Sequence, residues 1–420
     1  MLCGSCLRDN RLAATLRAAG RRVTLVPLYT PLRTDEDSVA EPHVLYGGIN
    51  VYLQQALPLL RLGPREADGA LISPRLLARL SGASGSVRPS RLGAMTVSVL
   101  LGEEGRQRKE LERLLDWVVP RRFDVICLPN LMLLGLARKL RAETGTRIAC
   151  TLSGEDVFVH TLPEPHRSRA MRAIRERSRD VDAFIAVTRY FAEHASRHFG
   201  LPRERVHVVP LGVNTDDFEP AQPAGRFTIG YLARICPEKG LLSLARAFAT
   251  LRQQGRDCRL VVGGYLSAAD RPYFERIRAG LRARGLEHDC AWLGELDRAG
   301  KLAMLRSLHA LSVPTAYAEA KGLYVLEAFA SGVPVVQPAH GSFPELIEET
   351  GGGLLVPPGD SDALAAALAR LMDDEPLRRD LAQRGAAGVR AGLTDRMMAE
   401  RTWALFEQLA RGAPLPSGAA

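Results

Sequence analysis

The chain of 420 residues alternates short apolar runs with helical stretches, in two series that one breaker segment separates. The first series begins near Val23 and ends near Val209, and the second begins at Phe227 and ends near Val356. Between them, residues 210–225 combine proline, glycine and acidic residues, as interdomain connections do. Strand–helix alternation predicts parallel sheets covered by helices on both faces. The expected fold class is therefore α/β, with two doubly wound parallel-sheet domains.

The expected strands are apolar runs bounded by turn residues, and the expected helices are longer stretches between them. The strands are predicted at 23–26, 125–128, 148–152, 183–187, 206–209, 227–234, 258–262, 310–313 and 333–336. The helices are predicted at 12–19, 106–118, 131–142, 190–199, 241–251 and 323–330, with further helical sequence from 362 to 411.

Composition narrows the class of protein. The hydrophobic share of 46% and the charged share of 25% are ordinary for a soluble protein. No run approaches the roughly 18 apolar residues of a membrane span, and no secretory leader pattern is recognisable, so we expect a cytoplasmic protein. The net charge is +9, but lysine occurs at only five positions, so 56 − 5 = 51 of the basic residues are arginine. These arginines are scattered among carboxylates, and nucleic-acid binding is not expected.

Two glutamates, Glu319 and Glu327, flank the start of one predicted helix. Ligands of open parallel sheets sit beyond the carboxyl ends of strands, where helices begin. The unpaired backbone amides near Gly322 and Leu323 would face an anion there. Two carboxylates that accept hydroxyl groups, beside an anion-binding helix start, suit a sugar joined to a nucleoside diphosphate.

Two cations, Arg234 and Lys239, follow the strand that begins at Phe227. At the carboxyl end of a strand they would neutralise a diphosphate as it leaves the sugar carbon. Gly263 and Gly264 follow the next strand, where the absence of a side chain would allow close approach of a nucleotide.

These residues and their neighbours resemble a known family. The Pro-Thr before Glu319, the Leu-Glu-Ala around Glu327 and the Gly-Val-Pro-Val-Val that follows resemble the Glu-x7-Glu signature of retaining GT-B glycosyltransferases of family 4, also called group 1. The segment from Arg234 to Lys239 resembles the Arg-x4-Lys-Gly element of the same family. The similarity is most specific over residues 205–360 and is traceable through the amino-terminal half.

The resemblance implies a retaining hexosyl transfer from a nucleotide sugar to an acceptor hydroxyl. Glu319, Arg234 and Lys239 would be catalytic, Glu319 would contact the donor sugar, and Glu327 would contact the ribose. The donor would be linked to UDP, GDP or ADP, and the acceptor would be a glycan, a lipid or a small molecule. No metal or cofactor is implied, because Arg234 and Lys239 would balance the diphosphate charge, and the departing phosphate would accept the acceptor's proton in place of a general base.

The resemblance also implies the domain organisation. It gives an acceptor-side Rossmann-like domain over 1–214, a nucleotide-sugar-binding Rossmann-like domain over 215–394, and a helix over 395–420 that returns to the first domain. Residues 1–10 resemble the glycine-bearing loop after the first strand of these enzymes, which places Gly4 and Ser5 on the acceptor side. Because no strand sequence precedes that loop, we expect Met1 to be a misassigned start, or the chain to be truncated or compensated.

The segment after strand 148–152 departs from the family pattern. Ser153 stands where many members carry a histidine beside the donor sugar. We expect Ser153 or Asp156 to take its place, and Glu155 to act on the acceptor hydroxyl.

Alternative interpretations stay open. Residues 46–52 resemble those of glycogen and starch synthases, which favours an ADP-glucose-dependent glucan synthase, although Cys3 to Cys6 stand in place of their Lys-x-Gly-Gly loop. A GT-B-shaped epimerase or a non-catalytic sugar-nucleotide-binding protein is the hypothesis from another class. The joint presence of the two cations and two glutamates argues against it.

Other clusters carry weaker signals. Cys3 and Cys6 lack a second pair of metal ligands, and the acidic residues 35–37 and 180–182 are interpreted as a solvated loop and a surface turn. The arginine-rich stretch 167–179 is either a solvated helix face or a weak contact with an anionic membrane, which would place the protein peripherally on the inner face.

Overall fold

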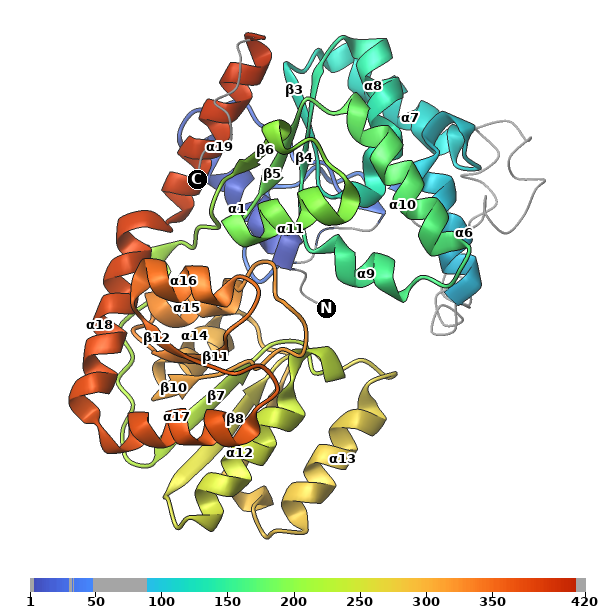
Figure 1. Ribbon diagram of the computed structural model, residues 1–420. Coiled ribbons are helices and arrows are strands. Elements are labelled where there is room, and N and C mark those ends of the chain that lie inside the picture. The colour runs from blue at the N-terminus through green and yellow to red at the C-terminus, as the bar shows by residue number, and fades with distance from the viewer. Residues whose placement is uncertain (1–3, 30–31, 33, 48–88, 413–420) are drawn as a thin grey trace. The chain divides into compact units, whose positions relative to one another are not determined.

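The computed structural model describes residues 4–29, 32, 34–47 and 89–412, which form two compact units (Figure 1). Unit 1 comprises Met1–Ala19, Arg33–Asp37 and Pro210–Glu400, as far as these ranges are described. Unit 2 comprises Gly20–Leu32, Ser38–Val209 and Arg401–Ala420, with the same restriction.

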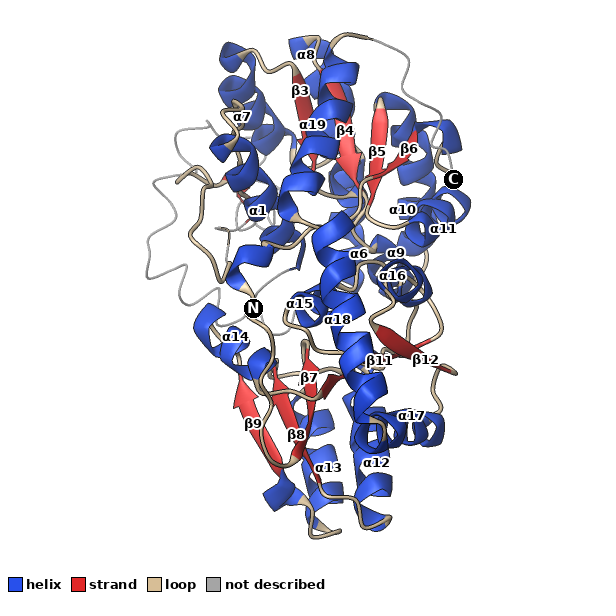
Figure 2. Cartoon of the chain, turned by 90° about the vertical axis from the view of Figure 1, so that its left-hand side faces the viewer, coloured by secondary structure: helices blue, strands red, loops and turns tan. Residues whose placement is uncertain are grey.

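Unit 1 contains a six-stranded parallel sheet in the order β12-β11-β10-β7-β8-β9. Its strands are β7 (Phe227–Leu232), β8 (Cys258–Gly263), β9 (Cys290–Gly294), β10 (Ala310–Leu311), β11 (Val335–Pro338) and β12 (Gly353–Val356). Figure 2 shows β7, β8 and β9 side by side. Successive strands are added outward from β7 on one side and from β10 on the other, so the order reverses between these two neighbours. This switch point is where open α/β sheets bind their ligands.

The helices of unit 1 connect these strands and continue beyond them. They are α1 (Gly4–Ala18), α12 (Leu241–Gln253), α13 (Arg271–Arg282), α14 (Arg298–Arg306), α15 (Leu323–Ala330), α16 (Phe343–Thr350), α17 (Ser361–Asp373), α18 (Glu375–Gly392) and the first residues of α19 (Asp395–Ala410). Central positions such as Ile229 in β7, Leu260 in β8 and Phe329 in α15 are completely buried. The continuous apolar runs of the sequence therefore mark strands and helices that are covered on both sides.

Unit 2 contains a four-stranded parallel sheet in the order β3-β4-β5-β6 and a small parallel pair, β1 with β2. Its strands are β1 (Leu28–Tyr29), β2 (Leu45–Gly47), β3 (Val125–Leu128), β4 (Arg147–Thr151), β5 (Ala183–Ala186) and β6 (Val206–Val208). Its helices include α6 (Pro89–Leu100), α7 (Arg108–Val118), α8 (Ala137–Thr144), α9 (Glu155–Thr161), α10 (His166–Arg177) and α11 (Arg189–Phe199). Among the described helices of both units, none combines the length and apolarity needed to cross a membrane.

Two expectations for the amino-terminal region are wrong. Residues 4–10 form the start of helix α1 rather than a loop, and their polar side chains find partners in other segments: Asn10 is fully buried, and its Nδ2 donates to the Asp37 carbonyl at 2.9 Å. The strand predicted at 23–26 is reduced to an isolated bridge between Leu25 and Ala40, since no ladder continues on either side of it.

The predicted domain ranges of 1–214, 215–394 and 395–420 differ from the two units chiefly at the amino terminus. Helix α1 groups with unit 1 because its polar side chains contact that unit. Thr15 Oγ1 donates to Asp395 Oδ2 at 3.1 Å, and Arg11 forms an ion pair of 2.5 Å with Glu36. The predicted ranges stay a prediction, and the chain passes between the units three times from residue 19 to residue 38, again near Val209 and once more within α19.

His309 lies just before β10 and gives the fold a pH dependence. Its Nδ1 accepts from the Thr228 amide at 3.0 Å, and burial, helped by Arg378 and Arg259, lowers the pKa of His309 to about 4. An unfolded histidine takes up a proton near its ordinary pKa of 6.5, whereas the folded one stays neutral until about pH 4. Stability therefore falls as the pH drops through this window, by up to about 3 kcal/mol.

We expect His309→Asn to flatten this acid-side loss, because the amide oxygen can still accept from Thr228 but cannot be protonated. Urea unfolding at pH 7 and pH 5 measures the effect, and the exposed His288, changed to Asn, is the control. An equal loss of stability between the two pH values in His309→Asn and in the unchanged chain would contradict the assignment.

Candidate active site

The loops that leave β7 and β10 meet at the switch point of the unit 1 sheet. The β7 loop carries Arg234 and a short 3₁₀ turn, Pro237–Lys239, and the β10 loop carries Glu319. A hydrogen bond between backbone groups joins the two loops: the Ala316 amide donates to the Glu238 carbonyl at 2.8 Å. The two loops therefore bring Lys239 and Glu319 together, and their expected catalytic roles stay a prediction.

Lys239 and Glu319 form an ion pair, through Nζ and Oε2. Two tyrosines complete the group: Lys239 Nζ donates to Tyr317 Oη at 2.7 Å, and Tyr317 Oη donates to Glu319 Oε2 at 3.0 Å. Tyr324 Oη lies 3.4 Å from the same carboxylate oxygen. Lys239 Nζ is also 5.1 Å and 5.4 Å from the centres of the Tyr317 and Tyr324 rings, within the range of cation–π attraction.

The environment of this group shifts the pKa of Glu319 and of both tyrosines. Burial alone would raise the pKa of Glu319, but the Lys239 ammonium and the hydroxyl of Tyr317 together bring the pKa of that carboxyl below its ordinary value. Burial, reinforced by the Glu319 charge, raises the pKa of Tyr317 and of Tyr324. Glu319 is therefore a carboxylate at neutral pH, and both phenols keep the protons that they donate.

Glu327 lies in α15, about one turn beyond its start, and is buried with 7% of its surface exposed. Lys301 Nζ, from α14, donates to Glu327 Oε1 at 2.6 Å. The same ammonium forms a 2.5 Å ion pair with Asp35 Oδ2. Interpreting residues 35–37 as a solvated loop is wrong for Asp35, whose side chain is only 2% exposed because this ion pair holds it inside unit 1.

The predicted glycines lie where a Cβ atom would collide with the protein itself, and their expected contact with a nucleotide stays a prediction. Gly322 precedes α15 with a φ of +67°, and among the described residues no side chain caps this helix start. Leu323 is the first residue of α15. Gly263 ends β8, and Gly264 follows with a φ of +149°, its amide donating to the Gly294 carbonyl at 2.7 Å.

Arg234 belongs to the same loop as Lys239, but among the described residues it forms no ion pair with Glu319. Its guanidinium is exposed, 4.0 Å from Glu238 Oε2, while its carbonyl accepts from Tyr231 Oη at 3.0 Å. The structure thus fixes the backbone at Arg234 and leaves the cation at the surface. Its expected role on the diphosphate stays a prediction.

Gly4 and Ser5 form the start of helix α1 in unit 1, beside the β10 loop. Lys321 Nζ donates to Ser5 Oγ at 2.5 Å, and the Lys321 amide lies 3.4 Å from Glu319 Oε1. The amino-terminal segment predicted to face the acceptor therefore reaches the loop that carries Glu319.

Ser153, Glu155 and Asp156 belong to unit 2 and lie at the carboxyl end of β4. The carboxylate of Glu155 is buried and accepts from the Ser153 amide at 2.9 Å and from the Leu131 amide at 3.3 Å. Asp156 Oδ2 lies 3.1 Å from His194 Nε2, and Ser153 Oγ donates to the Pro129 carbonyl at 3.2 Å. These contacts give Glu155 a structural task at the turn, and the expected roles toward sugar and acceptor stay predictions.

The arginine-rich stretch is helix α10, and it is only partly a solvated face. Arg177 is 2% exposed, and its Nη2 donates to the Leu101 carbonyl at 2.7 Å. Arg172 and Arg175 are exposed beside a surface pocket of about 420 Å³. Contact with an anionic membrane stays a prediction.

Among the described residues, no group of three or more His, Cys, Asp or Glu side chains is arranged to hold a metal ion. Cys3 lies outside the described residues, as do residues 48–52 of the segment that resembles glucan synthases. Independence from metals stays a prediction.

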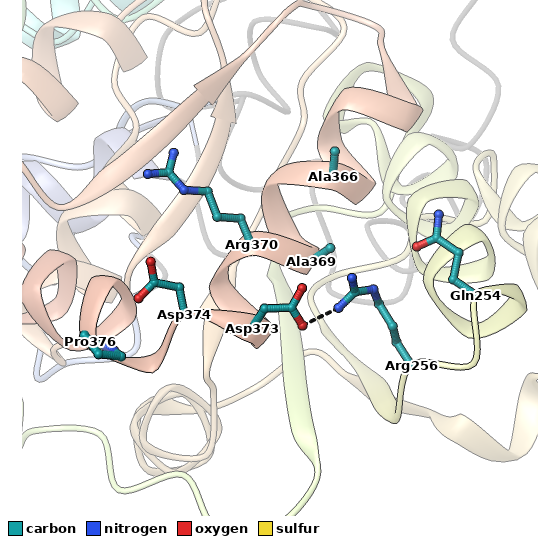
Figure 3. Close-up of a pocket in the computed structure, with 8 residues that line it drawn as sticks. All are labelled: Gln254, Arg256, Ala366, Ala369, Arg370, Asp373, Asp374 and Pro376. Atoms are coloured by element: carbon teal, nitrogen blue, oxygen red, sulfur yellow. Dashed lines mark hydrogen bonds and ion pairs between the residues drawn. The ribbon is translucent and has the colours of Figure 1, made fainter.

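A surface hollow of about 740 Å³ in unit 1 lies away from the predicted site residues (Figure 3). Arg256 and Asp373 cross it with a 2.5 Å ion pair, and it lies beside the turn that precedes β8. Ligands of such sheets bind at the carboxyl ends of strands, so this hollow is at the opposite end from the switch point. None of the predicted site residues lines it.

The sequence relationships agree with the geometry. Residues 213–387 match the family model of glycosyl transferases group 1, and residues 87–217 match that of glycosyltransferase family 4. The chain is 30% identical over 289 residues to a GDP-mannose-dependent alpha-(1-6)-phosphatidylinositol monomannoside mannosyltransferase of Mycolicibacterium smegmatis, a match that covers 61% of this chain and 68% of the relative. The chain belongs to the group 1, or family 4, glycosyltransferases.

Other family members match over shorter stretches. A phosphatidyl-myo-inositol mannosyltransferase of Mycobacterium leprae is 35% identical over 188 residues, which are 43% of this chain and 48% of the relative. The chain thus spans about half the length of that relative. Among solved structures, sucrose-phosphate synthase from Thermosynechococcus elongatus superposes with a TM-score of 0.69 at 20% identity, covering 96% of this chain and 92% of the synthase. The predicted GT-B fold class, with two Rossmann-like parallel sheets, is confirmed.

Sequence reasoning missed five residues of this site: Asp35, Lys301, Tyr317, Lys321 and Tyr324. A signal existed for the lysines, because three of the five lysines in this arginine-rich chain, at 239, 301 and 321, lie here. A compact ammonium on a flexible stem differs from a planar guanidinium, so each of the few lysines was a candidate for a specific role.

Proposed function

We propose that the protein is a retaining glycosyltransferase that moves a hexose from a nucleoside-diphosphate sugar to an acceptor hydroxyl. The observation that carries the proposal is the Lys239–Glu319 pair at the switch point of the unit 1 sheet. Family membership supports the class of reaction, and the mannosyltransferases among the relatives make GDP-mannose the first donor to test.

The residues divide the work by chemistry. Glu319, kept charged by Lys239, accepts hydrogen bonds from hydroxyls of the donor sugar. Lys239 and Arg234 balance the charge that grows on the leaving diphosphate, and the amides at the start of α15 bind its oxygens. Glu327 accepts from the ribose, the departing phosphate takes the acceptor's proton, and Lys239 and Arg234 stand in the place of a metal ion.

For the acceptor, we propose a hydroxyl of a glycolipid or a glycan. This choice rests on the relatives, two of which are named for acceptors built on phosphatidylinositol. An acceptor of this kind would bring the protein to a membrane surface, where the exposed arginines of α10 would contact anionic headgroups.

The donor is tested by ligand-induced stabilisation. We expect one of GDP, UDP and ADP to raise the thermal midpoint in the presence of EDTA, because a ligand present at 100 times its Kd stabilises the folded state by about 2.7 kcal/mol. The matching nucleotide sugar should then release its nucleoside diphosphate when an acceptor is added. Stabilisation by none of the three would contradict the proposal, and an altered sugar without transfer would indicate an epimerase.

A further inference from the structure

Lys301 connects the carboxylate expected to hold the ribose with the amino-terminal segment 34–37. Its ammonium lies between Glu327 Oε1, at 2.6 Å, and Asp35 Oδ2, at 2.5 Å. The side chains of Lys301, Glu327 and Asp35 are 9%, 10% and 2% exposed. Removing three charged groups from water costs free energy, and ion pairing often does no more than offset that cost. Stabilisation of the fold therefore does not by itself explain why this group is buried.

Lys301 occupies one of the two carboxylate oxygens of Glu327. Among the described residues, only Lys301 donates to the Glu327 carboxylate, and it does so through Oε1. The second oxygen, Oε2, is left to accept from a ligand. Burial would lower the pKa of Lys301, but the charges of Glu327 and Asp35 raise it, so Lys301 stays a cation that orients the carboxylate.

We propose that Asp35 and Lys301 are positioning residues for the donor nucleotide: Asp35 holds Lys301, and Lys301 fixes the Glu327 carboxylate toward the ribose hydroxyls. The inference rests on the proposed function, since it needs a ribonucleotide donor. It extends the nucleotide site to a residue far from the family motifs in sequence.

The neighbouring Glu36 supplies a matched control. It lies on the same segment and is also paired, but with Arg298 at 3.0 Å and Arg11 at 2.5 Å rather than with Lys301. Glu36→Gln and Asp35→Asn therefore remove the same charge from the same segment. Only Asp35→Asn takes a partner from Lys301, which then keeps Glu327 alone.

The experiment measures the preference for ribose by calorimetry. Each variant is titrated with ADP, GDP and UDP and with their 2′,3′-dideoxy forms. We expect the unchanged chain to bind its ribonucleotide about tenfold more tightly than the dideoxy form, because hydrogen bonds to a charged group are worth that much. Asp35→Asn and Lys301→Met should reduce this ratio to about twofold, and Glu36→Gln should keep it.

The affinities for the dideoxynucleotides distinguish a positioning role from a structural defect. A structural defect would weaken the ribonucleotide and the dideoxynucleotide equally and leave the ratio of their affinities unchanged. If Lys301→Met fails to fold, the double variant Asp35→Asn, Lys301→Met removes both charges of the pair and takes its place. A ratio that persists in Asp35→Asn and in the lysine variant overturns the inference, as does an equal loss in Glu36→Gln. An unchanged chain that binds no nucleoside diphosphate contradicts the proposed function instead.

Discussion

Glu319→Gln is expected to lower the turnover number at least ~100-fold, or about 2.7 kcal/mol of activation free energy. Lys239 and the two tyrosines, Tyr317 and Tyr324, direct their hydrogen atoms at one carboxylate oxygen. A neutral amide of nearly the same shape cannot balance the Lys239 charge. Lys239→Met should lose as much, because it leaves the buried carboxylate without its cation and removes a charge from the leaving diphosphate.

The control for both changes is an exposed pair of the same residue types. Lys139 and Glu143 form a 2.5 Å ion pair on α8, with side chains 39% and 44% exposed. Exposed pairs of this kind contribute at most about 1 kcal/mol, so Lys139→Met and Glu143→Gln should leave turnover within about twofold. Turnover is measured as nucleoside diphosphate released by folded protein. More than a tenth of the normal rate in Glu319→Gln would defeat the site assignment.

The sequence predicted those parts of the fold that are buried on both faces. The runs at 183–187 and 323–330 match β5 and α15, because continuous apolar sequence favours the interior: β5 is buried throughout, and α15 is buried at all but its first two residues. The strands β9 and β12 were missed, and both are edge strands of the unit 1 sheet. Leu293 in β9 is 43% exposed and Leu355 in β12 is 40% exposed, so neither strand carries the signature of a buried run.

The candidate site divides in a similar way. Glu319, Glu327 and Lys239 could be predicted, because each stands at a fixed spacing from a strand end or a helix start. Asp35 and its pairing with Lys301 could not, since that pairing depends on where α1 and the segment after it pack within unit 1. Local patterns of polarity carry no information about such contacts, which tertiary packing alone creates. Asp35 accordingly resembled a solvated residue in the sequence.

Gly240→Ala is expected to lower the free energy of unfolding by about 3 kcal/mol and to reduce turnover in the protein that remains folded. Gly240 connects Lys239 to α12 with a φ of +74°, and a Cβ there would lie 1.7 Å from the Pro314 carbonyl oxygen. The backbone must therefore separate the β7 loop from the β10 loop. These two loops carry Lys239 and Glu319.

Gly255, just beyond the other end of α12, is the control that distinguishes the steric contact with Pro314 from the strain of a positive φ. Its φ of +78° is nearly the same, but a Cβ at Gly255 would have nothing within 4 Å. Gly255→Ala should cost only the strain of the left-handed conformation, about 1 kcal/mol, and should keep normal turnover. Denaturant unfolding and initial rates on both variants measure the two effects. If Gly240→Ala matched Gly255→Ala in stability and in rate, the contact with Pro314 would not be what holds Lys239 and Glu319 together.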